Sequence, residues 1–356
     1  MLGHAFTADQ QHASQLLRSG PPRRLGRVPH LPDSYVTSRR WSIGIVSPEP
    51  CSSLSGNGVT ARRWETLLAE LGHRVRVQSA YAGEDYDLLI SLHAMKSAAA
   101  IEAFHERFPG RPQVLALTGT DLYGDLEGDP RALRSLELAD RYVVLQPRGL
   151  NRLPGELRER AVAIHQSLAR IVRRAPKSEG AFDVCVLSHL RHVKDPLLAA
   201  AAVQLLPPES DVQVTHVGAA FEPELGRRAK KETTTNPRYR WVGELDREAA
   251  LAVLAASRIL VLTSRMEGGA NVVSEAIAAG VPILSTRIDG SVGILGEDYP
   301  GYFPVGDAQA LSDLLRRAET DPGFYADLRR HIERLVPLVD PARERAAWKR
   351  LLASLC

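Results

Sequence analysis

The sequence predicts an α/β protein in which two doubly wound, parallel-sheet units follow one another along the chain. From Trp41 onward, short apolar runs alternate with helix-like segments, a pattern typical of a parallel sheet covered by helices on both faces. A stretch rich in Pro, Gly and charge, residues 173–182, interrupts this alternation once. The chain has 356 residues, 44% of them hydrophobic and 24% charged, which suits two globular domains of ordinary size.

Residues 1–40 differ in composition from the rest of the chain. They hold six Arg against two acidic residues and lack the apolar core of a secretory signal. We therefore expect a disordered extension here, followed by a first unit over 41–172. Its predicted strands are 42–47, 74–80, 86–93, 112–119, 141–146 and 161–167.

The alternation restarts after the predicted linker at 173–182. We expect a second unit over 183–320 and closing helices over 321–356 that cross back to the first unit. The predicted strands of the second unit are 183–189, 212–219, 239–245, 258–264 and 281–287. Ligands of doubly wound sheets bind at the carboxyl ends of the strands, so the cleft between the units is the expected site.

Composition excludes several classes of protein. The net charge of +3 and the absence of a basic stripe argue against nucleic-acid binding. No apolar run approaches the roughly 18 residues of a spanning helix, which argues against a membrane protein. The three cysteines lie far apart, which argues against a zinc site and suits the reducing cytoplasm.

The run "SRMEGGANVVSEAIAAGVPIL", residues 264–284, follows a predicted strand and opens a helix. Gly268 and Gly269 allow the backbone to approach a ligand closely. The backbone N–H groups near Asn271 form an anion site at the helix start.

Two glutamates, Glu267 and Glu275, flank this helix start. A carboxylate can accept hydrogen bonds from a pair of sugar hydroxyls. A nucleoside diphosphate fits this spacing, with phosphate at the helix start, ribose at Glu275 and a further group at Glu267. The alternative is an ordinary helix start at which the dipole favours acids.

The run "VLSHLRHVKDP", residues 186–196, follows the first strand of the second unit and gathers His189, Arg191, His192 and Lys194. Cations at the carboxyl end of a strand would neutralise a departing diphosphate. A basic loop with solvated side chains is the alternative.

A Gly/Ser-rich loop, residues 50–65, lies between the first predicted strand and the first helix and can admit an anion. It contains Gly-Asn-Gly, as a dinucleotide-binding fingerprint does. Ala61 stands where that fingerprint has its third small residue, a position at which alanine is tolerated. The strand 74–80 ends without the acid that would bind ribose, which argues against a nicotinamide cofactor. Arg62 and Arg63 can supply charge to an anionic acceptor or remain solvated.

Two strand ends of the first unit are expected to face the cleft, at His93 and at "LTGTD", residues 117–121. The alternative for a single histidine at a strand end is a structural role. The "DYD" run at 85–87 spells the DxD of metal-dependent transferases, but it precedes a strand rather than following one. We interpret it as a turn and expect no metal site and no cofactor.

The run at 264–284 resembles the E-x7-E signature of glycosyltransferase family 4, a retaining family with the GT-B fold. Glu267 and Glu275 take the two glutamate positions. The run "SHLRHVKDP" is similar to the family's GRLxxxKD pattern. This resemblance implies that Lys194 takes the place of the diphosphate-binding lysine and that His189 stands where the family has arginine.

Five runs between Trp41 and Asp307 are together similar to the selenosugar synthases of selenoneine biosynthesis: "SPEPCSSLSGNGVTARRW", "DLLISLHAMKSA", "LTGTDLYGD", "LSHLRHVKDPL" and "SVGILGEDYPGYFPVGD". The resemblance implies a UDP-sugar donor, usually UDP-N-acetylglucosamine, and selenophosphate as the acceptor. It also implies functional links to a selenophosphate synthetase and a selenoneine synthase. Selenophosphate is already anionic and selenium is soft, so no strong general base is required.

These observations assign expected roles to the candidate residues. The catalytic residues are Lys194, Glu267 and His93. The donor-binding residues are His189, Arg191, Gly268, Gly269, Asn271, Glu275, Thr118 and Asp121. The acceptor-binding residues are Gly56, Asn57, Gly58, Thr60 and Arg62. The alternatives are an ordinary retaining glycosyltransferase with a hydroxyl or thiol acceptor, a non-catalytic nucleotide-sugar binder and, more distantly, a dehydrogenase.

Overall fold

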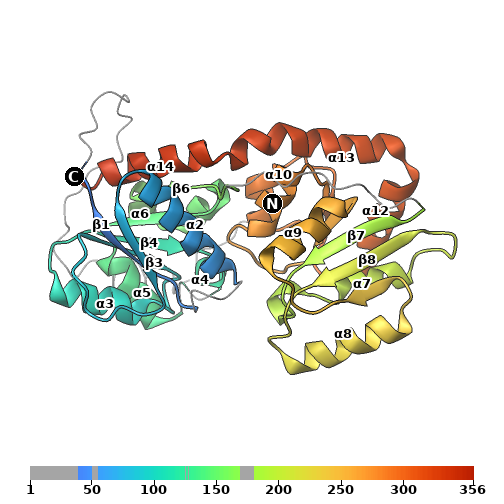
Figure 1. The fold of residues 1–356 in the computed structure, drawn as a ribbon, viewed down its shortest axis with the longest axis horizontal. Helices are drawn as coiled ribbons and strands as arrows, with labels where there is room; N and C mark the ends of the chain where they lie inside the picture. Colours follow the sequence, from blue (N-terminus) through green and yellow to red (C-terminus); the bar gives the residue numbers. More distant parts are fainter. Residues whose placement is uncertain (1–38, 50–54, 125, 127, 169–179) are drawn as a thin grey trace, which may run out of the picture.

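The computed structural model describes residues 39–49, 55–124, 126, 128–168 and 180–356. The predicted extension at 1–40 and the predicted linker at 173–182 lie mostly outside these ranges. The described residues form two six-stranded parallel sheets, each flanked by helices, that lie side by side (Figure 1). The predicted α/β fold with two doubly wound units is confirmed.

The first sheet has the strand order β2-β1-β3-β4-β5-β6. Its strands are β1 (Ser42–Val46), β2 (Arg74–Gln78), β3 (Leu88–Leu92), β4 (Gln113–Leu117), β5 (Arg141–Val144) and β6 (Ala161–Ala163). The helices of this unit are α2 (Gly56–Glu70), α3 (Ala98–Arg107), α4 (Thr120–Tyr123), α5 (Pro130–Leu138), η1 (Pro147–Arg152) and α6 (Gly155–Glu159). The order of the strands reverses between β1 and β3, and in doubly wound sheets the ligand binds at the carboxyl side of such a reversal.

The second sheet has the strand order β12-β11-β10-β7-β8-β9 and reverses between β7 and β10. Its strands are β7 (Phe182–Leu187), β8 (Val212–Val217), β9 (Tyr239–Trp241), β10 (Ile259–Leu262), β11 (Ile283–Thr286) and β12 (Tyr302–Phe303). Its helices are η2 (His192–Lys194), α7 (Leu198–Gln204), α8 (Pro223–Thr235), α9 (Arg247–Ala256), α10 (Asn271–Ala279), α11 (Asp289–Leu295) and α12 (Ala308–Thr320).

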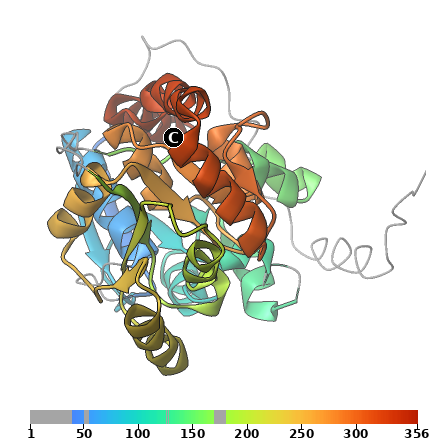
Figure 2. The same cartoon turned by 90° about the vertical axis from the view of Figure 1, so that its right-hand side faces the viewer.

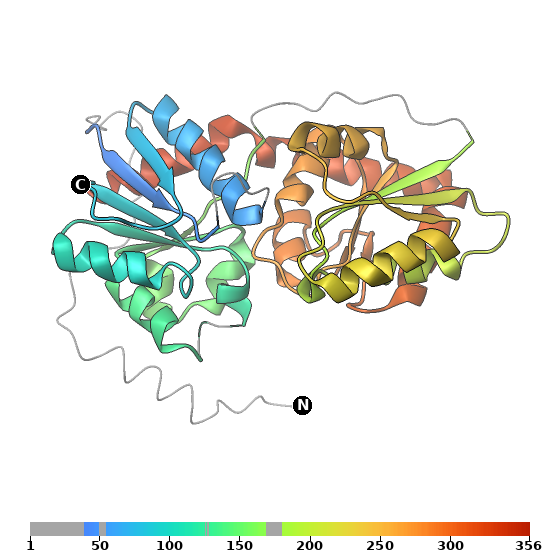
Figure 3. The same ribbon diagram turned by 60° about the horizontal axis from the view of Figure 1, so that its bottom comes forward.

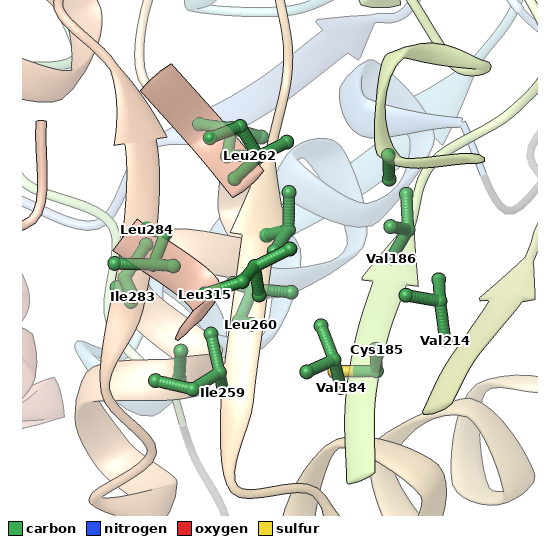
Figure 4. Close-up of a cluster of buried hydrophobic side chains, with 14 of the residues drawn as sticks. Val184, Cys185, Val186, Val214, Ile259, Leu260, Leu262, Ile283, Leu284 and Leu315 are labelled. Carbon is green, nitrogen blue, oxygen red and sulfur yellow. The ribbon is translucent and has the colours of Figure 1, made fainter. Parts of the chain in front are cut away.

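Alternating residues of the buried strands pack on opposite faces of the first sheet. Ile90 contributes to the core beneath α2, whereas its neighbour Leu89 packs with Phe104 of α3 on the other face. This two-residue period follows from the pleat of a strand. The second sheet encloses a larger core, shown in part in Figure 4, where Val184, Leu260 and Ile283 come from three adjacent strands.

The closing helices join the two units. α13 (Pro322–Leu335), η3 (Val336–Val339) and α14 (Pro341–Ala353) run from the second unit back along the first (Figures 1 and 3). Figure 2 shows the same helices from the side of the second unit. The ring of Trp348 in α14 packs edge-on against Trp64 of α2, with ring centroids 4.8 Å apart, so α14 completes the core of the first unit.

The α11 segment was not predicted as a helix. Its sequence, DGSVGIL, contains two glycines, which disfavour helix formation. Contacts from the first unit stabilise it instead, because Asp289 accepts hydrogen bonds from Arg148 at 3.0 Å and from Arg152 at 2.8 Å. No helix in the described part of the chain combines the length and apolar character needed to cross a bilayer.

Trp348→Ala is expected to lower the free energy of unfolding by about 3–5 kcal/mol, because a fully buried indole is replaced by a cavity. Urea denaturation followed by circular dichroism measures the change. Leu205→Ala, at a side chain that is 51% exposed, serves as the control and should change the free energy by less than about 0.5 kcal/mol. Equal, small effects in both variants would contradict a structural role for α14.

Candidate active site

A cavity of about 270 Å³ lies between the two units and is lined by residues from both. It sits where both sheets reverse their strand order, beyond the carboxyl ends of β1, β3, β7 and β10. The predicted residues that line it are Gly56, Asn57, Thr60, His93, Thr118, His189, Arg191, Lys194, Glu267, Gly269, Asn271 and Glu275. Gly58, Arg62, Asp121 and Gly268 were also predicted but are not among its lining residues.

Lys194 and Glu267 form an ion pair within this cavity. Lys194 ends the η2 turn after β7, and the backbone carbonyl of Lys194 accepts the hydroxyl of Thr263 at 2.8 Å. Glu267 follows β10 and also accepts the hydroxyl of Ser264 at 2.6 Å. Because β7 and β10 are adjacent parallel strands, the two loops meet. The Glu267 side chain is only 10% exposed, so it needs the lysine to compensate its buried charge.

Helix α10 begins at the cavity. Its N-cap residue makes no side-chain capping bond, and the first N–H groups of a helix have no partner within the helix. Glu275, in the second turn of α10, pairs with Arg247 at 2.7 Å. Asn271 reaches the first unit, donating to the carbonyl of Gly56 at 3.1 Å and accepting from Arg63 at 2.8 Å.

The two glycines after Glu267 take part in the packing between the two units. A Cβ at Gly268 would lie 2.5 Å from the carbonyl carbon of Thr118, and one at Gly269 would lie 2.7 Å from the Cβ of Leu145. These glycines therefore let the turn approach the first unit closely. The predicted close approach to a ligand stays a prediction, and Gly269 lines the cavity. The absence of a side chain allows the two units to meet beside the cavity.

His93 and Thr118 lie on the opposite wall, in the first unit. His93 has a φ of 73°, a backbone conformation that is uncommon outside glycine, and its Nε2 lies 3.1 Å from the hydroxyl of Thr120. Asp121 was predicted to contact the donor sugar, which the structure does not support. It is fully buried and accepts the N–H groups of Ala94 at 3.0 Å and Gly119 at 2.8 Å, so it shapes the loop and does not face the cavity.

The arginines of the predicted acceptor loop do not face the cavity. Arg62 is not among the lining residues. The guanidinium of Arg63 is enclosed between the units, where it donates to Gln166 at 2.7 Å and pairs with Glu344 of α14 at 3.2 Å. Neither arginine therefore lines the cavity where the acceptor was predicted to bind, whereas Gly56, Asn57 and Thr60 do line it.

Two neighbouring histidines, His189 and His216, lie on the side of the cavity that the second unit forms. The Nδ1 of His189 accepts the N–H of Ala219 at 3.1 Å, so in the neutral ring the proton is on Nε2. His216 is fully buried and donates from Nε2 to the carbonyl of Ser188 at 2.9 Å. Burial lowers the pKa of His216 to about 4, so the ring is neutral at pH 7 and anchors the loop that carries His189.

The charges around the cavity are balanced. Sequence reasoning identified the cations at 189–194 but missed several lining residues that carry charge. The charged lining residues are Lys96, Arg191, Lys194, Arg247, Glu49, Glu244, Glu267 and Glu275. Lys96 and Glu49 follow strand ends within runs quoted for the resemblance, so the rule that ligands bind at strand ends could have found them.

The DxD run does not contribute to the cavity. Asp87 accepts the backbone N–H of Ser42 at 2.8 Å, and Asp85 pairs with Arg111. Within the described ranges, no group of three or more His, Cys, Asp or Glu side chains is arranged to hold a metal ion.

Known proteins share both the sequence pattern of the second unit and the fold of the chain. Residues 169–334 match the family model described as "Glycosyl transferases group 1". The crystal structure of HepE from Anabaena in complex with UDP-glucose is similar, with a TM-score of 0.70 and 17% identity over 88% of this chain and 100% of that one. The fold is therefore GT-B, and the family match supports a glycosyltransferase of group 1.

Two other solved structures share this architecture. Sucrose-phosphate synthase from Thermosynechococcus elongatus has a TM-score of 0.70 and 18% identity, over 88% of this chain and 98% of that one. The pneumococcal O-GlcNAc transferase GtfA, in complex with UDP and GlcNAc, has a TM-score of 0.58 and 15% identity, over 75% of this chain and 56% of that one. At these identities the similarity extends to the fold.

Gly268→Ala is expected to reduce kcat/KM by about 10-fold or more, because the new methyl group would overlap the Thr118 carbonyl and push the units apart. Steady-state kinetics with a UDP-sugar measure this loss. Gly155→Ala, at a glycine with no atom near its missing Cβ, is the matched control and should leave kcat/KM unchanged. Full activity in Gly268→Ala would show that the close contact is dispensable.

Proposed function

We propose that this protein transfers a sugar from a UDP-sugar, in the first instance UDP-N-acetylglucosamine, to selenophosphate. The observation that carries the proposal is the meeting of Lys194, Glu267, Asn271 and Glu275 on one wall of the interdomain cavity. The family match, the UDP-sugar complexes of similar structures and the ordered resemblance to selenosugar synthases support it.

The donor would be bound by the second unit. Its diphosphate would lie at the start of α10 and at Lys194, where the ammonium and the helix dipole neutralise the leaving group. Its ribose hydroxyls would donate to Glu275, and its sugar hydroxyls to Glu267. Side chains and a helix start supply this stabilisation, so the proposed reaction uses no metal ion.

In the proposed reaction, selenium attacks the anomeric carbon with its electron pair. The bond between that carbon and the diphosphate oxygen breaks, and its electron pair leaves with UDP. Water then cleaves the selenium–phosphorus bond, which gives the 1-seleno sugar and inorganic phosphate. Exclusion of bulk water by the closed cavity would limit hydrolysis of the donor during the first step.

An ordinary retaining glycosyltransferase with a hydroxyl or thiol acceptor is the second candidate. The balanced charge of the cavity favours it, because the first unit offers Glu49 as well as Lys96 to an acceptor. Incubation with UDP-N-acetylglucosamine and either selenophosphate or candidate alcohols separates the two proposals. Release of UDP that requires selenophosphate, with a seleno sugar identified by mass, is the expected result.

Lys194→Ala is expected to reduce kcat by about 10²–10³-fold, because the leaving diphosphate loses its main cation. UDP release measures the rate, and circular dichroism tests whether the variant is folded. Lys231→Ala, an exposed lysine on α8, is the control and should retain full activity. A wild-type rate in folded Lys194→Ala would remove Lys194 from the mechanism.

A further inference from the structure

Two charged side chains of the first unit, Glu49 and Lys96, line the cavity and were not among the residues predicted to bind the acceptor. Glu49 follows β1 and Lys96 follows β3, the adjacent strands between which the first sheet reverses its order. The Nζ of Lys96 lies 3.9 Å from the Oε1 of Glu49. The pair thus occupies on the first sheet the same topological position as the Lys194–Glu267 pair on the second, and ligands bind at this position.

Lys96 is the only lysine or arginine that the described residues of the first unit contribute to the cavity lining. Arg63 is tied to Glu344 and Asn271, and its side chain is only 9% exposed. Lys96, in contrast, keeps 37% of its side chain exposed. An anionic acceptor that enters from the first unit therefore meets the ammonium of Lys96, with the carboxylate of Glu49 beside it.

The hydrogen bonds among the described residues leave the carboxylate of Glu49 largely unused. Its Oε2 is enclosed and has no hydrogen-bond partner among the described residues, and its Oε1 lies 3.9 Å from the Nζ of Lys96. The buried carboxylate of Glu344 differs, because it binds Trp64 at 2.8 Å and the N–H of Ser167 at 2.7 Å. A carboxylate left unsatisfied at a cavity requires an explanation, and a ligand that donates a hydrogen bond provides one.

The turn that carries Lys96 is held firmly. The hydroxyl of Ser97 donates to the carbonyl of Leu92 at 2.6 Å, and the N–H of Ser97 donates to the carbonyl of His93 at 3.1 Å. These bonds fix the backbone of the lysine, so ligand binding orders only its side chain.

We propose that Glu49 and Lys96 form the acceptor subsite, which recognises a small phosphoryl-type oxyanion that still carries one proton. The ammonium of Lys96 binds the anionic oxygens, and Glu49 accepts a hydrogen bond from the protonated oxygen. This inference rests on the proposed function, in which selenophosphate is such an anion. It replaces Arg62 with Lys96 as the cation of the acceptor side.

Kinetics with both substrates test the subsite. Lys96→Ala is expected to raise the KM for selenophosphate about 10-fold or more, since a charge-assisted hydrogen bond is lost, and to leave the KM for the UDP-sugar within about 2-fold. Lys96→Arg should recover part of the loss. Glu49→Ala should raise the same KM, and Glu49→Gln, whose amide oxygen still accepts a hydrogen bond, should recover part of it. Lys230→Ala, an exposed lysine on α8, is the control.

An unchanged KM for selenophosphate in Lys96→Ala would overturn the inference and leave the proposed function intact. Absence of selenophosphate-dependent UDP release in the wild type would instead overturn the proposed function. In that case calorimetry with thiophosphate, added to the protein saturated with UDP, decides the inference. Binding that Lys96→Ala weakens about 10-fold supports the anion subsite; equal binding in both proteins, or none in the wild type, overturns it.

Discussion

The ion pair between Lys194 and Glu267 is the interaction on which the cleft depends. It joins the loops after two adjacent strands, β7 and β10, and thereby positions the turn that leads into α10. Glu267 is 9% exposed, and an isolated carboxylate at that depth would be strongly unfavourable. In the proposed reaction the same two groups bind the sugar nucleotide, the cation at its diphosphate and the carboxylate at its hydroxyls. The pair thus holds the two loops together beside the cavity.

Close packing between the units places the first unit opposite the Lys194–Glu267 ion pair, across the cavity. Gly268 and Gly269 lie against the backbone and side chains of the first unit, and a Cβ at Gly293 would lie 2.6 Å from the side-chain carbon of Gln146. Asn271 adds hydrogen bonds to α2. Three glycines and one amide therefore bring the second unit close to the wall that carries His93 and Thr118. Helix α14 reinforces the arrangement, because its Glu344 holds Arg63 at the same junction.

The fold could be predicted because the alternation of strands and helices is a local pattern. Lys194, Glu267 and Glu275 could be predicted to line the cavity because they lie in the segments that follow strand ends. Contacts between units could not be predicted in this way. Arg62 and Arg63 looked equivalent in the sequence, but only Arg63 points into the junction, where Glu344 comes from the far end of the chain. Asp121 looked like a ligand contact because no local pattern shows that it caps its own loop. The α11 helix was missed because its stability comes from η1.

The cavity is lined by paired charges that the substrates separate in the proposed reaction. Lys194 with Glu267, Arg247 with Glu275 and Lys96 with Glu49 each hold a cation beside a carboxylate. A crystal structure of the protein with UDP-N-acetylglucosamine tests this most directly. We predict that the Nζ of Lys194 lies within hydrogen-bond distance of a diphosphate oxygen and that Glu275 accepts hydrogen bonds from the ribose hydroxyls. A donor bound elsewhere, with Lys194 still paired to Glu267 and Glu275 to Arg247, would contradict it.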